Sequence, residues 1–438
     1  MTPTHTQFII VANLRHGTLL GGGLSILFYD RLKTGQLTTV SSHKYELISN
    51  LAKLGYTITL LNADYPRKVE EIIASNPPSL GKGVRSKLLS WRATRSLRGG
   101  IGILWSFGRD LSFFLAAFSL IIVKKRNLDV IYRRHSLFNS DYLFAKLFGI
   151  PLVKEVNGIE SANASVTGFT DRFSLHIIRR IEKFNMPRAD KIIVVTPKLK
   201  ETLQKDYGVP GDKIVVIPNG ANTELFKPMN TDQARRQVKL AQAGPLVVFA
   251  GDLVAWKGVS CLIKSIPYAV KEFPEARFLI IGDGMLMQEL VELARQVGVS
   301  DKIIFTGMVP YQNVPLYINA SDICAAPFDA SRDEKIGLSP LKTHEYMACG
   351  KPVVASRISG LRILETTGAG ILVEPGSPSA LAQAILRLLQ RKELRELMGK
   401  NGRKYMVENR SWESVAKRVA LVLEQTCDIK PTRGGMAD

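Results

Sequence analysis

The sequence predicts an α/β protein made of two doubly wound parallel sheets, and three observations support this fold class. The chain has 438 residues, more than one hydrophobic core usually holds, which favours two or three domains. Short strand-like runs alternate with helix-length amphipathic segments, as in parallel sheets that carry helices on both faces. The alternation stops once, at 226–244, and then restarts, so we expect two units with a cleft between them.

The first unit is expected to begin with a β-strand and continue with strands and helices in turn. Its expected strands are apolar runs that end in loop residues, and they lie at 24–30, 56–62, 129–134, 150–156, 191–196 and 213–220. A loop with Gly35 and Gln36 follows the first strand, and a helix is expected near 41–54. The run FIIVAN at 8–13 is either an N-terminal extension or the first strand itself, and the sequence leaves both open.

The second unit repeats the alternation of strands and helices after a linker with a short helix. Its expected strands lie at 245–251, 277–284, 302–307, 322–328, 351–356 and 370–376. A last helix begins at Ser411 and carries apolar residues at helical spacing. We therefore predict domains at 1–228 and 229–408. The remaining segment, 409–438, is predicted to hold a helix that packs back on the first domain, followed by a mobile tail.

Composition favours a folded enzyme in a reducing compartment. Apolar residues make up 45% and charged residues 22% of the chain, which is ordinary for a globular protein. The four cysteines are far apart and form no CxxC pair, so neither a disulfide framework nor a metal site is expected. The longest apolar stretch, at 111–123, is shorter than the roughly 20 residues that a spanning helix needs. The first residues make a poor signal peptide, and we expect a cytoplasmic location.

The formal net charge of +20 is concentrated in the first half of the chain. The segment 72–109 contains no acid, and its basic residues alternate with apolar ones as on a helix at a membrane interface. Its basic residues are Lys82, Arg85, Lys87, Arg92, Arg95, Arg98 and Arg109. A solvated loop with scattered charge is the alternative, and no nucleic-acid motif accompanies the charge. We expect an anionic membrane surface or an acidic lipid substrate as the partner.

The stretch GLSPLKTHEYMACGKPVVASR carries the strongest functional signal. Ser339 suits an N-cap and Pro340 the first helical position, which would direct the amides of Leu341 and Lys342 at a ligand. Glu345 lies one turn further on the same face, where its carboxylate could accept hydrogen bonds from two ribose hydroxyls. A helix start with free amides and a lysine suits a sugar diphosphate. An ordinary surface pair of Lys342 and Glu345 is the alternative.

A second, weaker motif is FAGDLVAWKGV at 249–259. Here a strand ends at Gly251, and a helix begins near Lys257 and Gly258. The pattern offers a diphosphate free backbone N–H groups and a nearby positive charge. A surface lysine is the alternative interpretation.

Taken in order, the motifs resemble the large retaining glycosyltransferase family four, which has the GT-B fold of two facing Rossmann-like domains. The resemblance covers most of the chain and rests on the segments ADKIIVVTPKLKETL, KIVVIPNGANTELFKP, GDLVAWKGV, FLIIGDG, FTGMVPYQNVPLYINASDICAAPF and HEYMACGKPVVAS. It implies retaining transfer of a sugar from a nucleoside diphosphate sugar, with no metal ion and no cofactor. UDP and GDP both remain open as the nucleotide.

The resemblance also implies which residues form the site. Lys257 would bind the diphosphate, Glu345 the ribose, and backbone groups near Gly307 the base, while the first domain would hold the acceptor. The expected donor-binding residues are Gly251, Lys257, Gly307, Met308, Val309, Ser339, Leu341, Lys342 and Glu345. The expected acceptor-side residues are Gly35, Gln36, Arg92, Arg95, His135 and Asn157. Glu345, Lys257 and Asn157 are the expected catalytic residues.

Three positions depart from the family pattern. Asp252 stands where many relatives carry an arginine that shares the diphosphate, and Gly337 stands where many carry a glutamate, Glu334 being the nearest acid. Asn157 replaces a histidine, and an asparagine can orient a hydroxyl but cannot act as a base at neutral pH. We hypothesise that Lys342 supplies the positive charge that the missing arginine would have given.

The sequence therefore predicts a hexosyltransferase that is peripheral on the inner face of a membrane. Its expected acceptor is a lipid-linked saccharide or a polysaccharide in envelope or exopolysaccharide biosynthesis. Two alternatives remain. A non-hydrolysing nucleotide-sugar epimerase on the same fold would turn over its substrate without an acceptor. A non-catalytic, glycosyltransferase-like scaffold is the alternative that Asp252, Gly337 and Asn157 favour.

Overall fold

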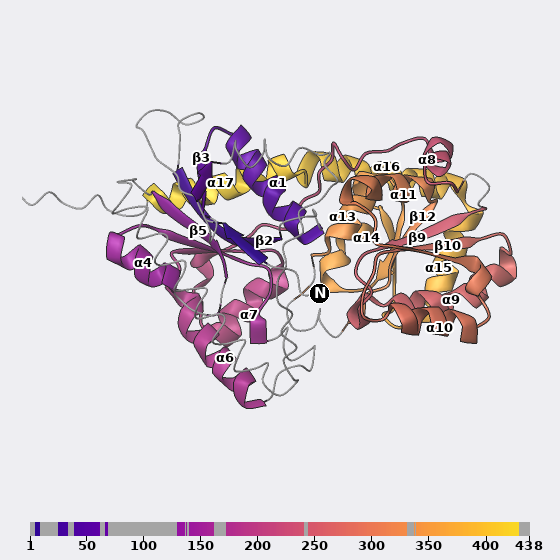
Figure 1. The fold of residues 1–438 in the computed structure, drawn as a ribbon, viewed down its shortest axis with the longest axis horizontal. Coiled ribbons are helices and arrows are strands. Elements are labelled where there is room, and N and C mark those ends of the chain that lie inside the picture. The colour runs from indigo at the N-terminus through magenta and orange to yellow at the C-terminus, as the bar shows by residue number, and fades with distance from the viewer. Residues whose placement is uncertain are drawn as a thin grey trace, which may run out of the picture. The chain divides into compact units, whose positions relative to one another are not determined.

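A computed structural model describes most of the chain and divides it into two compact units (Figure 1). The described residues are 5–8, 25–33, 39–61, 66–68, 129–135, 137, 140–161, 172–240, 244–330, 337 and 339–428. The first unit comprises Met1–Ile217 and Ala416–Asp438, and the second comprises Pro218–Val415. The domain limits expected at 228 and 408 lie 11 and 7 residues from the crossings at 217 and 415, and they remain predictions. The basic segment 72–109, the apolar run 111–123 and the tail after residue 428 lie outside the described residues.

The first unit is built on a sheet of eight strands in the order β4-β3-β2-β5-β6-β7-β8, with β1 on β2. The strands are β1 (His5–Phe8), β2 (Ser25–Lys33), β3 (Thr57–Leu61), β4 (Pro66–Lys68), β5 (Val130–Arg134), β6 (Leu152–Val156), β7 (Lys191–Val194) and β8 (Ile214–Val216). The strands from β2 to β8 pair in parallel except β4, and β1 is antiparallel to β2. β4 was not predicted, because its three residues are too few to show a pattern.

The described helices of the first unit follow its strands, and the caps of α7 agree with its sequence. They are α1 (Thr39–Lys53), α4 (Ser140–Phe148), α6 (Arg172–Asn185) and α7 (Pro197–Tyr207). Thr196 caps α7 by accepting a hydrogen bond from the Leu199 amide at 3.0 Å, and Gly208 ends it with φ 66°. Such a left-handed residue after a helix is most easily a glycine. Every residue of β6 is buried, as expected of a strand covered on both faces.

A buried group of charges joins β5, β6 and α4. Arg133 and Lys154 are partners in the strand register, and both lie against the Asp141 carboxylate, at 3.6 and 3.4 Å. All three side chains are fully buried. Burial alone would raise the pKa of Asp141, but the charges of Lys154 and Arg133 bring it below its usual value.

The second unit contains a six-stranded sheet in which all neighbours are parallel, in the order β11-β10-β9-β12-β13-β14. Its strands are β9 (Leu246–Ala250), β10 (Arg277–Ile281), β11 (Ile303–Gly307), β12 (Ile323–Ala326), β13 (Val353–Ser356) and β14 (Gly370–Val373). They agree with the expected apolar runs. The chain order changes direction between β9 and β12, and parallel sheets usually bind ligands at the carboxyl ends of strands beside such a switch.

Nine helices of the described chain belong wholly or in part to this unit. They are α8 (Thr231–Gln237), α9 (Val259–Glu272), α10 (Met287–Gln296), α11 (Val314–Ala320), α13 (Leu341–Ala348), α14 (Ile363–Thr366), α15 (Pro378–Gln390), α16 (Lys392–Asn409) and α17 (Trp412–Asp428). Figure 1 shows α9, α10 and α15 on one side of the sheet and α13, α11 and α16 on the other. The two parallel-sheet units confirm the predicted fold class.

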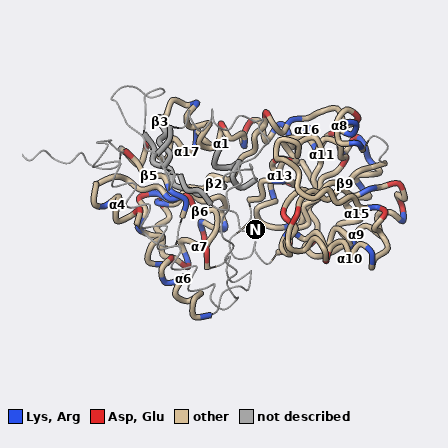
Figure 2. The backbone as a smooth tube through the Cα atoms, in the orientation of Figure 1, with Lys and Arg blue, Asp and Glu red and all other residues tan. Residues whose placement is uncertain are grey.

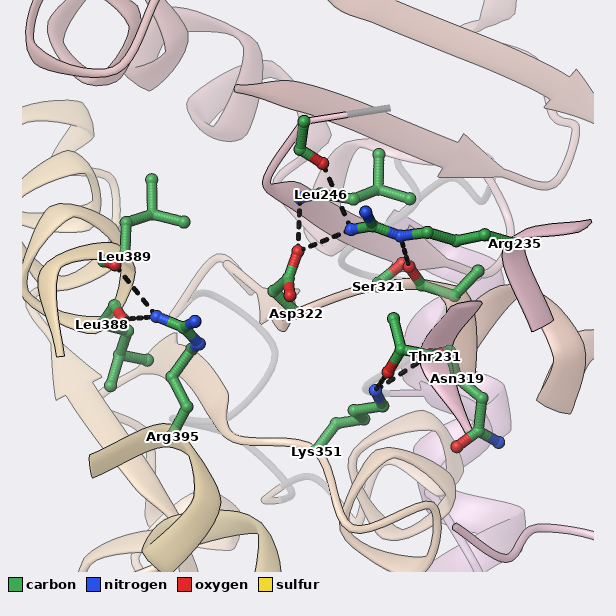
Figure 3. A network of polar contacts seen from close by, with 12 residues as sticks. Thr231, Arg235, Leu246, Asn319, Ser321, Asp322, Lys351, Leu388, Leu389 and Arg395 are labelled. Atoms are coloured by element: carbon green, nitrogen blue, oxygen red, sulfur yellow. Dashed lines mark hydrogen bonds and ion pairs between the residues drawn. The ribbon is translucent and has the colours of Figure 1, made fainter. Parts of the chain in front are cut away.

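Polar contacts fasten α8 to the second sheet (Figure 3). Arg235 donates to the Ala320 carbonyl and to the Asp322 carboxylate, each at 2.9 Å. Asp322 also accepts the amide of Leu246 at 2.8 Å, and Lys351 reaches the hydroxyl of Thr231 at 3.2 Å. The segment expected as a linker is therefore held by a network of charge-assisted bonds.

The last helix, α17, begins in the second unit and continues in the first. Ser411, just before it, forms a bridge with Ala221 of the second unit. Further along, Arg418 donates to the Val216 carbonyl at 2.8 Å, and Glu424 accepts a hydrogen bond from the Tyr56 hydroxyl. No helix in the described ranges is long and apolar enough to cross a membrane.

Removal of the Asp141 charge is expected to destabilise the first unit. Asp141→Asn keeps the shape of the side chain but leaves Arg133 and Lys154 without the carboxylate between them. Loss of one member of a buried ion group typically costs about 3 kcal/mol or more. Urea unfolding should show this loss, whereas Asp206→Asn, at an exposed site, should leave the midpoint unchanged. Equal midpoints for the two variants would contradict the prediction.

Candidate functional site

The candidate site lies at the carboxyl ends of β9 and β12, where the strand order changes direction. Gly251 follows β9, and the turn Ala255–Lys257 then leads into α9. Pro327 and Phe328 follow β12. The helix α13 lies near this end of the sheet, and its Tyr346 hydroxyl accepts a hydrogen bond from the Ala250 amide at 2.7 Å. The two motifs singled out in the sequence are thus brought together.

Two glycines allow this close approach. Gly258 has φ 71°, and a Cβ there would lie 1.6 Å from the Pro327 carbonyl oxygen. Gly251 has φ 142°, and a Cβ there would lie 2.9 Å from the Lys342 ammonium nitrogen. The backbone angle favours glycine at both positions, and at Gly258 the backbone of Pro327 also leaves no space for a side chain. The amide of Gly251 donates to the Ile281 carbonyl at 2.9 Å, which holds the turn against β10.

Lys342 is the most unusual residue of the site. Its side chain is 6% exposed, and its ammonium nitrogen lies 3.5 Å from the centre of the Phe249 ring and 5.3 Å from that of Phe328. Within the described part of the chain it has no hydrogen-bond partner. Burial, and then the charge of Lys257, lower its pKa well below the usual value. An unpaired buried cation costs free energy, so an arriving anion would be strongly favoured here.

Lys257 supplies a second positive charge beside the first. Its ammonium lies 4.0 Å from the centre of the Trp256 ring and 5.6 Å from that of Phe328. Trp256 in turn stacks on Phe328, with ring centres 6.0 Å apart. Both lysines therefore lie against the face of one aromatic side chain, an arrangement that stabilises cations. Two ammonium groups this close together suit a ligand with two negative charges.

Glu345 lies one turn after Lys342 and is also buried, with 5% exposure. Its Oε1 atom accepts a hydrogen bond from the Tyr311 hydroxyl at 3.1 Å. Burial raises the pKa of the carboxyl to about 7, and Tyr311, Lys342 and Lys257 offset part of this effect. Because both Lys342 and Glu345 are buried, they are not an ordinary surface pair.

The start of α13 differs from the prediction. Ser339 was expected as the N-cap, but the N-cap is Pro340, whose extended backbone with ψ 118° delays the helix to Leu341. The Ser339 hydroxyl is buried without a partner in the described residues, and its carbonyl accepts from the Asn219 side chain at 3.1 Å. The amides of Leu341 and Lys342 still have no partner within the helix, as the first turn of any helix requires.

The expected base-binding segment begins at the end of β11, which is separated from β9 by β10. Gly307 closes β11 with φ 66°, and its carbonyl accepts the Gly282 amide at 2.9 Å. Met308 is exposed and Val309 is half-buried. Tyr311 follows at once and contacts Glu345. The segment therefore reaches the same edge of the sheet as the two lysines.

Two departures from the family pattern have a physical explanation. Asp252 is exposed, where water screens its repulsion of an anion. Its charge raises the pKa of Lys342 against the effect of burial, so it lies close enough to favour the ammonium. Gly337 has φ 67°, a backbone conformation in which a glutamate would be strained.

In the first unit, Asn157 and His135 lie at the carboxyl ends of β6 and β5. The Asn157 amide donates to Oε1 of Glu155, whose other oxygen accepts from the Tyr132 hydroxyl at 2.9 Å. The Oδ1 atom of Asn157 is buried and has no partner among the described residues. His135 is bound through its amide to the Glu155 carbonyl at 2.8 Å.

The ring of His135 belongs to a buried polar network. Its Nε2 atom lies 3.7 Å from Oε1 of Glu182. Glu182 also accepts from the Ser161 hydroxyl at 2.6 Å and from the Glu160 amide at 2.7 Å. Burial opposes ionisation of Glu182, but His135 and Ser161 lower its pKa below the usual value. His135 thus has structural partners.

The other predicted acceptor-side residues, Gly35, Gln36, Arg92 and Arg95, lie outside the described residues. Tyr311, Phe249 and Phe328 also line the site, but they were not predicted as site residues. Aromatic residues at strand ends are common in cores, so spacing gives no signal for them. No group of three His, Cys, Asp or Glu residues in the described ranges could hold a metal ion.

Two family models match the chain. The model for glycosyl transferases group 1 matches residues 230–405, and that for glycosyltransferase family 4 matches residues 40–225. Among curated proteins, the chain is 28% identical over 305 residues to D-inositol 3-phosphate glycosyltransferase from Corynebacterium diphtheriae, covering 67% of this chain and 70% of that protein. It is 25% identical over 264 residues to alpha-D-kanosaminyltransferase from Streptomyces kanamyceticus, covering 59% and 67%.

Solved structures show the same fold at low sequence identity. Sucrose-phosphate synthase from Thermosynechococcus elongatus has a TM-score of 0.64 at 20% identity, covering 90% of this chain and 94% of that one. WaaG, a glycosyltransferase involved in lipopolysaccharide biosynthesis, has a TM-score of 0.60 at 13% identity, covering 89% and 97%. Anabaena Alr3699/HepE in complex with UDP has a TM-score of 0.58 at 21% identity, covering 71% and 83%.

The raised pKa of Glu345 predicts a pH-dependent stability. Between the usual value of 4.5 and the folded value of about 7, the folded chain keeps a proton that the unfolded chain has released. The free energy of unfolding should therefore fall by about 3 kcal/mol as pH rises through this window. Urea unfolding of the wild type and of Glu345→Gln from pH 4.5 to 8 measures the difference.

The glutamine variant should lack this part of the pH dependence, while Glu374→Gln, at an exposed site, should retain it. Parallel curves for the wild type and Glu345→Gln would show that Glu345 ionises normally.

Proposed function

This chain belongs to the glycosyltransferases of group 1 and family 4, and from this membership we propose that it transfers a sugar from a nucleoside diphosphate sugar with retention of configuration. The observation that carries the proposal is the buried ammonium of Lys342, which has no hydrogen-bond partner in the described part of the chain and lies beside Lys257. A diphosphate carries two negative charges in a small volume, which matches two ammonium groups over one aromatic ring. The first amides of α13 add donors that suit phosphate oxygens.

The ribose is assigned to Glu345. Tyr311 occupies one carboxylate oxygen, which leaves the other to accept hydrogen bonds from ribose hydroxyls. Once ligand hydroxyls bind the carboxylate, the ionised form is favoured over the neutral one. The base is assigned to Gly307, Met308 and Val309, which end the strand that leads to Tyr311. The solved structure of Alr3699/HepE with UDP favours a uridine nucleotide, with GDP as the alternative.

The chemical step needs no protein base in this proposal. The bond between the anomeric carbon and the diphosphate oxygen breaks, and the acceptor oxygen forms its new bond on the same face. The acceptor proton passes to the leaving phosphate oxygen. Lys257, Lys342 and the helix amides stabilise the charge that develops on the diphosphate. Asn157 orients a sugar hydroxyl through its Oδ1 atom, which accepts no hydrogen bond from the described residues.

The proposed acceptor is a lipid-linked saccharide or a polysaccharide, and the proposed place of work is the cytoplasmic side of an anionic membrane. The net charge of +20 favours an acidic surface or substrate. WaaG, which has the same fold, is involved in lipopolysaccharide biosynthesis. A non-catalytic scaffold is the second candidate, which Asp252 and Asn157 favour.

Nucleotide titration tests the donor site. Calorimetry with UDP, GDP, ADP and CMP in the absence of metal should give micromolar affinity for one nucleotide. Glu345→Ala should abolish this binding because the ribose loses its acceptor, while Glu292→Ala, at an exposed site on another helix, should bind normally. Absence of binding by every nucleotide would favour the scaffold.

In the wild type, the Lys342 side chain should lower the free energy of unfolding and raise the affinity for nucleotide. Lys342→Met removes a buried amine that has no hydrogen-bond partner among the described residues and should therefore raise the free energy of unfolding by about 1 kcal/mol or more. The same variant should weaken nucleotide binding about tenfold, as Lys257→Met does, because a charge-assisted bond to phosphate is lost. Calorimetry and urea unfolding together measure both effects. A Lys342→Met variant with normal affinity would remove Lys342 from the donor site.

A further inference from the structure

The helix α6 presents an unusual outer face, which is basic on one side and apolar on the other. We call this the α6 face and define it by its exposed residues Arg172, Phe173, Arg179, Arg180, Lys183 and Phe184. Phe173 is 75% exposed and Phe184 is 61% exposed. Two large aromatic side chains on one helix are rarely left in water without a partner.

The two kinds of side chain form separate stripes. Phe173, Ile177, Ile181 and Phe184 recur at intervals of four, four and three residues, which places them on one side of the helix. Arg172, His176, Arg179 and Lys183 recur at intervals of four, three and four residues and form the neighbouring stripe. Figure 2 shows basic residues along α6. This pattern of an apolar stripe beside a basic one is typical of helices that lie in a membrane interface.

Negative charge is absent from the described outer face of α6. Its one acid, Glu182, is fully buried and bound by Ser161, Glu160 and His135. The face therefore presents positive charge alone, which is complementary to an anionic surface.

Arg188 lies near aromatic rings of both α6 and α4. The guanidinium of Arg188 lies 3.3 Å from the centre of the Phe184 ring on α6 and 6.0 Å from that of Tyr142 on α4. The neighbouring residues of α4, Leu143 and Leu147, are each 61% exposed and lie one turn apart. The two helices thus offer apolar side chains near the same basic group.

From this arrangement we propose that the α6 face, with Leu143 and Leu147 of α4, binds a bilayer of anionic phospholipid. The apolar stripe enters the boundary between headgroups and acyl chains, and the basic stripe contacts the phosphates. This inference rests on the proposed membrane location, but it does not depend on the donor site, with which it shares no residue.

Vesicle flotation tests the proposal with the full chain. The wild type should bind phosphatidylcholine vesicles that contain phosphatidylglycerol and should not bind pure phosphatidylcholine. Binding should weaken in about 1 M salt, where the Debye length falls to roughly 3 Å. A wild type that binds neither kind of vesicle would overturn the proposal.

Two variants of α6, each with a matched control, test whether this helix binds the vesicles. Arg180→Glu with Lys183→Glu should lower the partition coefficient by at least about 25-fold, since each basic residue contributes about fivefold. The control, Lys400→Glu with Lys404→Glu on α16, makes the same charge change at exposed sites of the second unit and should have little effect. Phe173→Ser should lower binding about tenfold, whereas Leu397→Ser, at 56% exposure, should not.

Three further measurements separate the possible outcomes. Nucleotide affinity should stay normal in the α6 variants, so failure of membrane binding and failure of the donor site can be told apart. The thermal unfolding midpoint of Phe173→Ser should equal that of the wild type, and a large fall would show that the chain itself covers the face. Loss of a dimer in the α6 variants would assign the face to a second copy. Either result, or equal effects of the α6 and control variants, would overturn the proposal.

Discussion

The ammonium group of Lys342 lies among Phe249, Phe328 and the backbone of Gly251, and much of the second unit is arranged around it. The residue that follows β9, Gly251, has φ 142°, which favours glycine, and a Cβ there would lie 2.9 Å from the ammonium nitrogen, so that the lysine side chain would have to shift. The Tyr346 hydroxyl binds the last amide of the same strand and so fixes α13 against the sheet. Such a buried cation lowers the free energy of unfolding. A bound diphosphate would remove this penalty, and its affinity would be higher by the same amount.

The first unit also contains buried charges, but there they are paired with each other. Arg133 and Lys154 are as deeply buried as Lys342, but both lie within 4 Å of the Asp141 carboxylate. Their charges bring the pKa of Asp141 below its usual value, so the carboxyl group favours its ionised form. At Lys342 the pKa is lowered instead. The same degree of burial therefore accompanies a set of paired charges in one unit, and in the other a lysine whose charge a diphosphate would stabilise under the proposed function.

The sequence predicted the elements that depend on local pattern and missed those that depend on long-range contacts. Every strand of the second sheet coincides with an apolar run, because parallel strands are buried on both faces. Lys257 and Glu345 could be singled out because glycine turns and a helix start have local signatures. The N-cap at Ser339 was wrong, since the extended backbone of Pro340 moves the helix start by one residue. Tyr311 could not be predicted, because its bond to Glu345 joins residues far apart in the chain.

Burial is the main cause of both pKa shifts at the site: it lowers the pKa of Lys342 and raises that of Glu345. Each group is pushed toward its neutral form, so their spacing of three residues does not make a strong ion pair. A bound nucleoside diphosphate would reverse this balance, because its phosphates favour the ammonium and its ribose hydroxyls favour the carboxylate. Recognition of phosphate and of ribose would then strengthen each other, since ionisation of either group favours ionisation of its neighbour. Neither group lies on the α6 face, so donor binding and membrane binding can be altered separately.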